Sequence, residues 1–323
     1  MNDPPEGAPR FAAGDLLAHR FRVVRFLDRG GTGEVYEALE EPAGGRLALK
    51  AVHRALAGDP EVLERLRREV AFAADIGHPN VCRTYELVED GADRFITMEL
   101  LDGESLEARL ERGPMRPQEA LPIVRQMASA LSAAHDTGLV HGDFKSSNVM
   151  LVPDGGATRA VVTDFGTAPR PRDVDWRQPS DTVVGTPAYM APEQAQGLEI
   201  GPAADIYAFG VVLYEMVTGG ELPHHGDTAA ELLRERVDVL APTPRGQVPI
   251  LDLRWELVIL QCLEPEPEDR FRTLDDAVRA LEGGSIALSS SGEFRRTRRR
   301  RGLVAGALLA VAAALVTWWL AAR

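Results

Sequence analysis

Cysteine is scarce in this chain of 323 residues, which contains Cys82 and Cys262 and no other. Two cysteines cannot form the disulfide framework of a small secreted domain, and neither has neighbours at the spacing of a zinc site. We expect no secretory signal either, because the first ten residues, M-N-D-P-P-E-G-A-P-R, are polar and rich in proline. We therefore expect the folded part of the chain to lie in a reducing compartment.

Positive charge is also in deficit over most of the chain. The formal net charge is −13, although residues 295–301, R-R-T-R-R-R-R, hold six arginines. Removing these six positive charges leaves −19 for the rest, and so acidic a body disfavours nucleic acid as a partner. The apolar content of 45% and the charged content of 26% are typical of a folded globular protein and exclude a wholly disordered one.

One long apolar run stands out from this polar background. From Leu303 to Ala322 the chain has 20 residues without a charge. At about 1.5 Å per residue, a helix of this length is about 30 Å long and matches the hydrocarbon core of a bilayer. We expect a transmembrane helix over residues 302–322, with a buried core helix as the alternative. The small residues of G-A-L-L-A, within the run, are compatible with helix pairing and hence self-association.

The flanks of the run indicate its orientation. Trp318 and Trp319 lie near its far end, where an aromatic belt is expected, and the arginines precede its near end. The positive-inside bias then places residues 1–301 in the cytoplasm, on a single-pass anchor in the inner (cytoplasmic) membrane. Residues 284–301, rich in glycine and serine and then basic, are expected to form a juxtamembrane linker.

Strand-like patterns dominate the first hundred residues. F-R-V-V-R-F-L-D-R and E-V-Y-E-A-L-E flank the glycine-rich G-G-T-G, and three further apolar segments follow at R-L-A-L-K-A-V-H, V-C-R-T-Y-E-L-V and R-F-I-T-M-E-L. Between the third and fourth of these, Asp59-Pro60 opens an amphipathic helix that continues to about Ile76. The pattern predicts a lobe of five antiparallel strands and one helix over residues 18–99, after a flexible N-terminus at 1–17.

Helical patterns replace the strands after Gly103. They are expected at residues 104–111, 117–137, 204–219, 227–236, 253–262 and 274–282. The sequence therefore predicts an α+β chain in which a mainly helical lobe at 100–283 follows the smaller sheet lobe.

Four polar residues stand out in the second lobe. Asp143, Lys145 and Asn148 lie between two apolar runs in L-V-H-G-D-F-K-S-S-N-V-M-L, and Asp164 follows a short apolar strand in V-V-T-D-F-G. Carboxylate and amide oxygens suit Mg²⁺, which keeps open positions for phosphate. A further carboxylate can orient a hydroxyl, and a lysine can neutralise charge on a phosphoryl group. The cluster indicates phosphoryl transfer.

These residues belong to a series of motifs that resembles the bacterial eukaryotic-type (Hanks-type) serine/threonine protein kinases over about residues 18–283. The motifs occur in that family's order and spacing: L-D-R-G-G-T-G-E-V-Y, L-A-L-K, R-R-E-V, H-G-D-F-K-S-S-N, D-F-G, G-T-P-A-Y-M-A-P-E, D-I-Y-A-F-G and P-E-D-R-F. The resemblance implies a bilobal protein-kinase fold that binds ATP and Mg²⁺, with Mn²⁺ as an alternative ion. It also implies protein substrates and autophosphorylation.

The resemblance assigns roles to individual residues. Nucleotide contacts are implied for Leu27, Gly30, Gly31, Gly33, Val35, Ala48, Lys50, Met98, Glu99 and Leu101. Asn148 and Asp164 are implied as metal ligands. Asp205 is implied to anchor the backbone of the catalytic loop, and Glu193 to form a buried ion pair with Arg270.

Catalytic roles follow from the same resemblance. Asp143 would accept the proton of the substrate hydroxyl, and Lys145 occupies the placement of serine/threonine-specific enzymes. Lys50 would hold the α- and β-phosphates while paired with Glu69. Thr186 would bridge Asp143 and Lys145.

Three positions depart from the family pattern. Asp28 replaces the first glycine of the loop, which implies weaker ATP binding, and Ser146 stands where proline is frequent. Gly142 stands where many kinases carry an arginine that clamps a phosphorylated residue. We therefore expect activity that depends little on phosphorylation of Ser180 or Thr182.

Two other functions are compatible with parts of the sequence. A pseudokinase scaffold would explain Asp28 but not the intact lysine, carboxylates and asparagine. A small-molecule phosphotransferase can use an H-G-D loop but lacks the peptide-docking motif G-T-P-A-Y-M-A-P-E.

Overall fold

The computed structural model describes residues 8–54, 60–165, 187–226, 231–232, 234–235 and 239–285. The described residues up to Gly284 form one compact unit. The predicted membrane helix at 302–322, nearly all of the predicted linker and most of the helix predicted at 227–236 lie outside the described residues. Within those ranges, no helix combines the length and apolar character needed to cross a bilayer.

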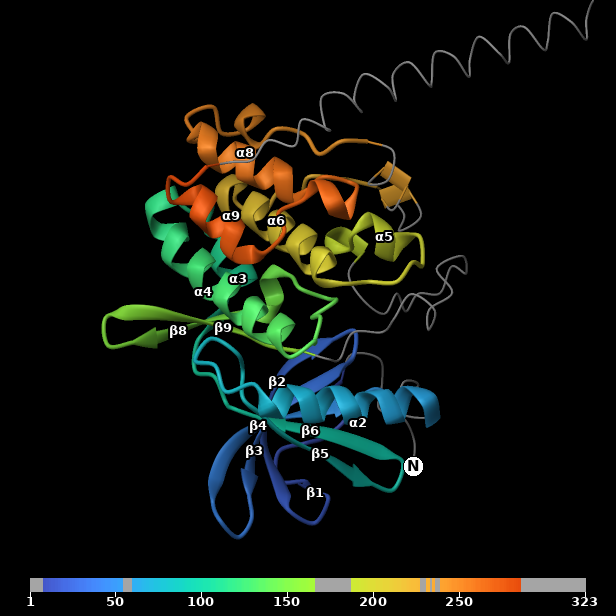
Figure 1. Cartoon of the computed structure of the whole chain (residues 1–323). Coiled ribbons are helices and arrows are strands. Elements are labelled where there is room, and N and C mark those ends of the chain that lie inside the picture. Colours follow the sequence, from blue (N-terminus) through green and yellow to red (C-terminus); the bar gives the residue numbers. More distant parts are fainter. Residues whose placement is uncertain are drawn as a thin grey trace, which may run out of the picture. The chain divides into compact units, whose positions relative to one another are not determined.

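The first lobe is an antiparallel sheet in the order β1-β2-β3-β4-β6-β5 (Figure 1). Its strands are β1 (Leu16–Leu17), β2 (Phe21–Gly30), β3 (Gly33–Glu40), β4 (Gly45–Val52), β5 (Thr84–Asp90) and β6 (Asp93–Met98). The five predicted strands are present, but the count of five is wrong because β1 pairs with β2 as a sixth. The two-residue strand is too short to show a periodic pattern in the sequence.

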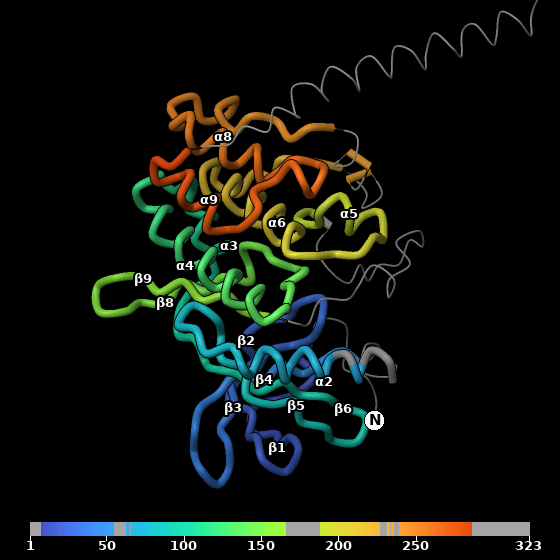
Figure 2. The backbone as a smooth tube through the Cα atoms, viewed as in Figure 1, coloured from blue at the N-terminus to red at the C-terminus, as the bar shows by residue number. Residues whose placement is uncertain are grey.

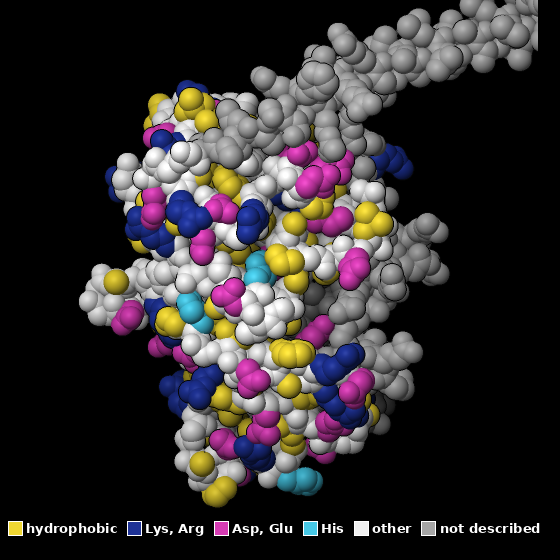
Figure 3. All heavy atoms as spheres, in the orientation of Figure 1, with side chains coloured by type: hydrophobic (Ala, Val, Ile, Leu, Met, Phe, Trp, Pro, Cys, Tyr) yellow, Lys and Arg dark blue, Asp and Glu magenta, His cyan; other side chains and the backbone are white. Residues whose placement is uncertain are grey.

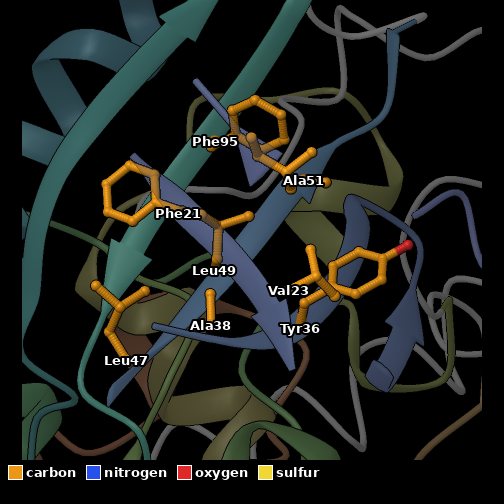
Figure 4. Close-up of a cluster of buried hydrophobic side chains, with 9 residues drawn as sticks. Phe21, Val23, Tyr36, Ala38, Leu47, Leu49, Ala51 and Phe95 are labelled. Atoms are coloured by element: carbon orange, nitrogen blue, oxygen red, sulfur yellow. The ribbon is translucent and has the colours of Figure 1, made fainter. Parts of the chain in front are cut away.

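Alternation along β4 gives the sheet two different faces. Leu47, Leu49 and Ala51 point to one side, into a cluster with residues of β2, β3 and β6 that Figure 4 shows. Ala48 and Val52 point to the other side, where they pack against α2 (Pro60–Asp75) and β6. Lys50 shares this second face by the same period of two. The strand therefore directs the lysine away from the first core and toward the second lobe.

The segment before residue 18 also differs from the prediction of a flexible N-terminus. Phe11 packs against the buried cluster of the sheet, and its ring centroid lies 5.7 Å from that of Tyr36 in an edge-on arrangement. The backbone N–H of Arg10 donates to Glu34 at 2.9 Å. Residues 8–17 are thus held on the first lobe, and an aromatic residue outside the predicted domain contributes to its core.

The second lobe is mainly helical, as predicted. Its helices are α3 (Leu106–Leu110), α4 (Pro117–Asp136), α5 (Pro192–Ala195), α6 (Pro202–Thr218), α8 (Leu253–Cys262) and α9 (Leu274–Leu281). Helix α6 contacts both α4 and α8, and Figure 2 shows it running through the middle of these elements. Residues Ala204–Val217 are buried on every side, so α6 forms the centre of this core.

A small sheet carries the polar loops of the second lobe. It consists of β7 (Glu104–Ser105), β8 (Val149–Asp154) and β9 (Ala157–Val162) in that order. The end of β9 also bonds to the segment after α2: the Val162 N–H donates to the Asn80 carbonyl, and the Val162 carbonyl accepts from the Cys82 N–H, both at 2.8 Å. The two lobes are therefore joined by backbone hydrogen bonds two residues before Asp164.

Basic and acidic side chains are intermixed on the surface, as Figure 3 shows for one face. Many of them form exposed pairs such as Arg112–Glu104, in which Nη1 lies 2.6 Å from Oε2. Exposed pairs of this kind each contribute about 0–1 kcal/mol to the free energy of folding. They therefore add little to the stability of the fold.

Candidate active site

A carboxylate of α6 accepts hydrogen bonds from the backbone of the loop between α4 and β8. Asp205 Oδ2 accepts from the backbone N–H of His141, and Oδ1 accepts from that of Gly142, both at 2.8 Å. His135 Nε2 of α4 lies 2.7 Å from the same Oδ2. Asp205 is buried, so these charge-assisted bonds are the stronger kind. The predicted anchoring of the loop backbone by Asp205 is confirmed.

The loop brings its three polar side chains together. Lys145 Nζ lies 2.8 Å from Asp143 Oδ2. Asn148 Nδ2 donates to the carbonyl oxygen of Asp143 at 2.9 Å, which fixes the amide plane of this buried residue. Because the side-chain nitrogen Nδ2 makes that bond, the side-chain oxygen Oδ1 of Asn148 lies on the other edge of the amide group.

Asp164 lies across from this group, in ionic contact with the first lobe. Its Oδ1 lies 2.8 Å from Nζ of Lys50, which is buried. Burial favours the neutral carboxyl, but the Lys50 ammonium outweighs it and holds the pKa of Asp164 below its ordinary value. The backbone of Asp164 has φ of 65°, a left-handed conformation that is unusual for a residue with a side chain. Such strain at a polar residue is typical of functional sites.

The structure shows an ion pair of Lys50 that the resemblance does not imply. The resemblance implies pairing with Glu69, a half-buried residue of α2, whereas the ion pair described here joins Lys50 to Asp164. The contact with Asp164 joins two residues that the resemblance assigns to the same site. The pairing of Lys50 with Glu69 stays a prediction.

The catalytic loop and the D-F-G segment are fastened together. His141 Nε2 lies 2.9 Å from the Thr163 carbonyl, and the Thr163 N–H donates to the Asn148 carbonyl at 2.9 Å. The His141 ring centroid lies 4.7 Å from that of Phe165. These contacts fix the backbone of Asn148 next to the backbone of Asp164.

Those two residues satisfy the chemistry that a magnesium nucleotide requires. Among the described residues, no cluster of three or more histidine, cysteine or acidic side chains is suited to hold a metal by itself. Mg²⁺ bound with phosphate commonly takes only one or two protein oxygens and completes its shell with phosphate and water. An asparagine carbonyl and a carboxylate on adjoining loops fit that requirement.

An apolar cluster lies beside the polar group. Val35, Ala48, Met98 and Leu101, four of the expected nucleotide contacts, pack into one cluster between the lobes. Met150 of β8 belongs to the same cluster and was missed, although the alternation of V-M-L-V after Asn148 places it on that side. A flat aromatic group would be enclosed by these side chains from both lobes.

The glycine-rich hairpin joins β2 to β3. Gly30 pairs with Gly33 at its tip, with Gly31 in the turn between them. A Cβ on Gly33 would lie 2.3 Å from the carbonyl oxygen of Ala51, so glycine is required there by the packing of β4. Asp28 is exposed, and its Oδ1 accepts the N–H of Arg29 at 2.8 Å. The carboxylate of Asp28 is therefore engaged with its own strand.

The connection between the lobes is also cross-linked. Glu99 Oε1 lies 2.7 Å from Nη2 of Arg159 in β9, and the Glu99 N–H donates to the Arg83 carbonyl at 2.8 Å. Leu27 is half-buried in β2. Thr186 lies outside the described residues, so its predicted bridge stays a prediction.

Ser146 belongs to a buried network that the sequence did not reveal. Its Oγ lies 2.9 Å from the Tyr189 hydroxyl and donates to Glu215 Oε1 at 3.3 Å. The Tyr189 hydroxyl also donates to that oxygen, at 2.7 Å. Burial raises the pKa of Glu215 to about 7. Serine in place of proline thus ties the catalytic loop to α6 and to the segment before α5.

The predicted ion pair behind α5 is confirmed. Arg270 Nη1 and Nη2 each lie 2.7 Å from a Glu193 carboxylate oxygen. The remaining guanidinium bonds go to the carbonyls of Glu264, Pro265 and Ala203. A fully buried, fully bonded arginine of this kind is structural.

Comparison with known proteins agrees with this geometry. The profile of the family described as "Protein kinase domain" matches residues 21–279. The chain is 37% identical over 266 residues to serine/threonine-protein kinase PkaA of Streptomyces coelicolor, and 34% identical over 283 residues to serine/threonine-protein kinase PknA of Mycobacterium tuberculosis. The crystal structure of the M. tuberculosis PknI kinase domain superposes with a TM-score of 0.68 at 28% identity, covering 84% of this chain and 98% of that one.

The relatives are longer than this chain. The matches cover 79% and 84% of this chain but 48% of PkaA and 63% of PknA. The similarity therefore concerns the kinase domain and not the remaining parts of those proteins.

Proposed function

Because this chain belongs to the protein kinase domain family, we propose that it transfers the γ-phosphoryl group of ATP to serine and threonine hydroxyls of protein substrates. The observation that carries the proposal is the assembly of Asp143, Lys145 and Asn148 on one fixed loop that is bonded to the loop of Asp164. Phosphoryl transfer depends mainly on positioning and on stabilisation of charge, which is what this assembly supplies.

Each side chain has a separate task in this proposal. Asp143 orients the substrate hydroxyl and accepts its proton, while Lys145, 2.8 Å from Asp143, stabilises negative charge on the phosphoryl oxygens. Lys50 binds the nucleotide phosphates, with Glu69 as a further carboxylate partner. Thr186, which lies outside the described residues, would connect Asp143 and Lys145 near the acceptor.

The nucleotide and its metal complete the site. Asn148 and Asp164 would hold Mg²⁺, which would offset the negative charge of the phosphates when bound. The apolar cluster of Val35, Ala48 and Met98 would enclose the adenine, beside the backbone of Glu99 and Leu101. The glycine-rich hairpin would offer backbone N–H groups to the phosphates.

Transfer of label from [γ-³²P]ATP to a general protein acceptor tests the proposal. We expect Asp143→Asn and Lys50→Met to lower the rate at least about 10²-fold, the usual scale for a base or a charge-stabilising group. The exposed Asp154→Asn serves as a control for loss of a carboxylate and should leave the rate unchanged. Binding of Mg-ATP by the unaltered chain without any transfer would indicate a scaffold instead of an enzyme.

We also propose that residues 302–322 anchor this kinase in the inner membrane with the catalytic domain in the cytoplasm. The support is the uncharged run of the sequence and the arginines that precede it. Expressed full chain should stay with membranes through alkaline extraction and should lose residues 1–301 to protease only when the cytoplasmic side is accessible. Release into the alkaline supernatant would contradict the anchor.

A further inference from the structure

The backbone of Gly142, the residue before the catalytic aspartate, is held on both sides by buried side chains. Gly142 has φ of 73°, in the left-handed region, and its N–H donates to Asp205 Oδ1 at 2.8 Å. Its carbonyl oxygen accepts from Gln194 Nε2, also at 2.8 Å. The first bond comes from α6 and the second from α5, elements that reach the loop from different parts of the chain.

Gln194 has its side-chain amide fixed in one orientation. The residue is 6% exposed, and its Oε1 accepts the N–H of Ala191 at 2.9 Å. Since a backbone N–H can only donate and a carbonyl can only accept, the amide cannot be turned over without losing both bonds. The Nε2 donor is therefore committed to Gly142.

The carbonyl that Gln194 holds lies directly before Asp143. The carbonyl of Gly142 and the N–H of Asp143 share one planar peptide unit, so fixing the oxygen fixes the plane from which the Asp143 Cα projects. Gly142 has no side chain that could brace this plane. The bond from Gln194 Nε2 supplies that constraint on the carbonyl side, and the Asp143 N–H donates to His141 Nδ1 at 3.3 Å on the other side of the plane.

We propose that Gln194 is a positioning residue for the phosphoryl-transfer reaction, which sets the direction of the Asp143 carboxylate by holding the carbonyl of Gly142. The inference rests on the proposed kinase function. It also connects two parts of the site, because Gln194 lies in α5, directly after the segment whose G-T-P-A-Y-M-A-P-E motif is expected to dock the substrate peptide. A displacement of α5 would thus reach Asp143 through a single hydrogen bond.

Gln194→Glu tests the hydrogen bond from Gln194 Nε2 to the Gly142 carbonyl. Glutamate keeps an oxygen that can accept from Ala191, but when ionised it has no donor for Gly142 and places a negative charge against that carbonyl. Gln196→Glu is the matched control, because it makes the same change at the exposed end of α5, where Nε2 donates to the Pro192 carbonyl at 3.2 Å. Gln194→Met, which removes both bonds with little change of volume, is the second variant.

We expect the kcat of Gln194→Glu to fall about 10- to 100-fold near neutral pH, the range for an unsatisfied buried acceptor, with the KM for ATP unchanged. Gln196→Glu should keep the kcat of the unaltered chain. As pH falls, the glutamate at position 194 is protonated and regains an O–H donor. The kcat of Gln194→Glu should then approach that of Gln196→Glu. Both variants contain the same ionisable groups around position 194 and the Gly142 carbonyl, so the titration of these groups cancels when the two kcat values are divided. The groups are Asp143, Lys145, His135, His141, Asp205, Glu193 and Arg270.

Hydrogen exchange gives a measurement that does not require activity. Amide exchange in the peptide covering residues 139–148 should be faster in Gln194→Glu and Gln194→Met than in Gln196→Glu, at equal global stability. Equal kcat and equal exchange in all three variants would overturn the inference. If the unaltered chain phosphorylates no acceptor, the proposed function fails, while the exchange comparison still decides the role of Gln194.

Discussion

The buried carboxyl of Glu215 makes the stability of this kinase dependent on pH in a direction opposite to that of most acidic residues. Glu215 lies on α6, is 5% exposed and accepts hydrogen bonds from Tyr189 and Ser146. Burial is the largest influence, and the negative charge of Glu107 adds to it, so the pKa of Glu215 rises to about 7 from 4.5 in spite of those bonds. Glu215→Gln keeps the shape of the side chain and removes the titration.

The magnitude follows from the two pKa values. Between 4.5 and about 7 the folded protein holds a proton on Glu215 that the unfolded chain has lost, so the free energy of unfolding falls as pH rises. Each unit of pKa difference corresponds to about 1.4 kcal/mol, which gives a total of roughly 3 kcal/mol. This contribution is fully present below pH 4.5 and is lost as pH rises through 7.

Urea denaturation of both proteins at pH 5, 6, 7 and 8 measures the effect, and subtracting the curve of Glu215→Gln removes the titrations that the two proteins share. The unaltered protein should lose about 2–3 kcal/mol relative to the variant across this range. Glu199→Gln, at an exposed position, should run parallel to the unaltered protein. A difference that stays constant with pH, or that grows in the other direction, would refute the assignment of a buried, protonated carboxyl.

Two further predictions concern packing. Arg270→Met should lower the free energy of unfolding by about 3–5 kcal/mol because it leaves Glu193 buried without its partner, whereas the exposed Arg279→Met should change thermal unfolding little; similar shifts would contradict a structural ion pair. Gly33→Ala should raise the KM for ATP several-fold, since its Cβ would press on the Ala51 carbonyl and push the hairpin tip from its place, and an unchanged KM in steady-state kinetics would contradict this.

Much of the fold could be predicted from local patterns. The apolar periodicity gave 117–137 for α4, which spans Pro117–Asp136, and 253–262 for α8, which spans Leu253–Cys262. Both helices begin at clear signals, a proline in the first turn and an aspartate N-cap. Strand β1 was missed because two residues carry no period, and the packing of Phe11 was missed because nothing near it in sequence marks its distant aromatic neighbours.

In the candidate site, too, contacts within one loop could be predicted and contacts between distant segments could not. Asp143, Lys145 and Asn148 were predictable because six consecutive residues of one loop contain them, and their spacing alone brings them together. The bond between Ser146 and Glu215 joins residues 69 apart, and that between Gln194 and Gly142 joins residues 52 apart. Such contacts depend on how α5 and α6 pack under the loop. Local patterns do not contain that information.

The contact between Lys50 and Asp164 has a consequence for what this cleft admits. The two opposite charges lie 2.8 Å apart and neutralise each other in buried surroundings. An anion bound at the ammonium would compete with the carboxylate, and a cation bound at the carboxylate would compete with the ammonium. A guest that carries both signs, such as a polyphosphate with a divalent ion, would offer an opposite charge to each group. We therefore expect such a guest to enter this cleft at a lower electrostatic cost than an ion of a single sign.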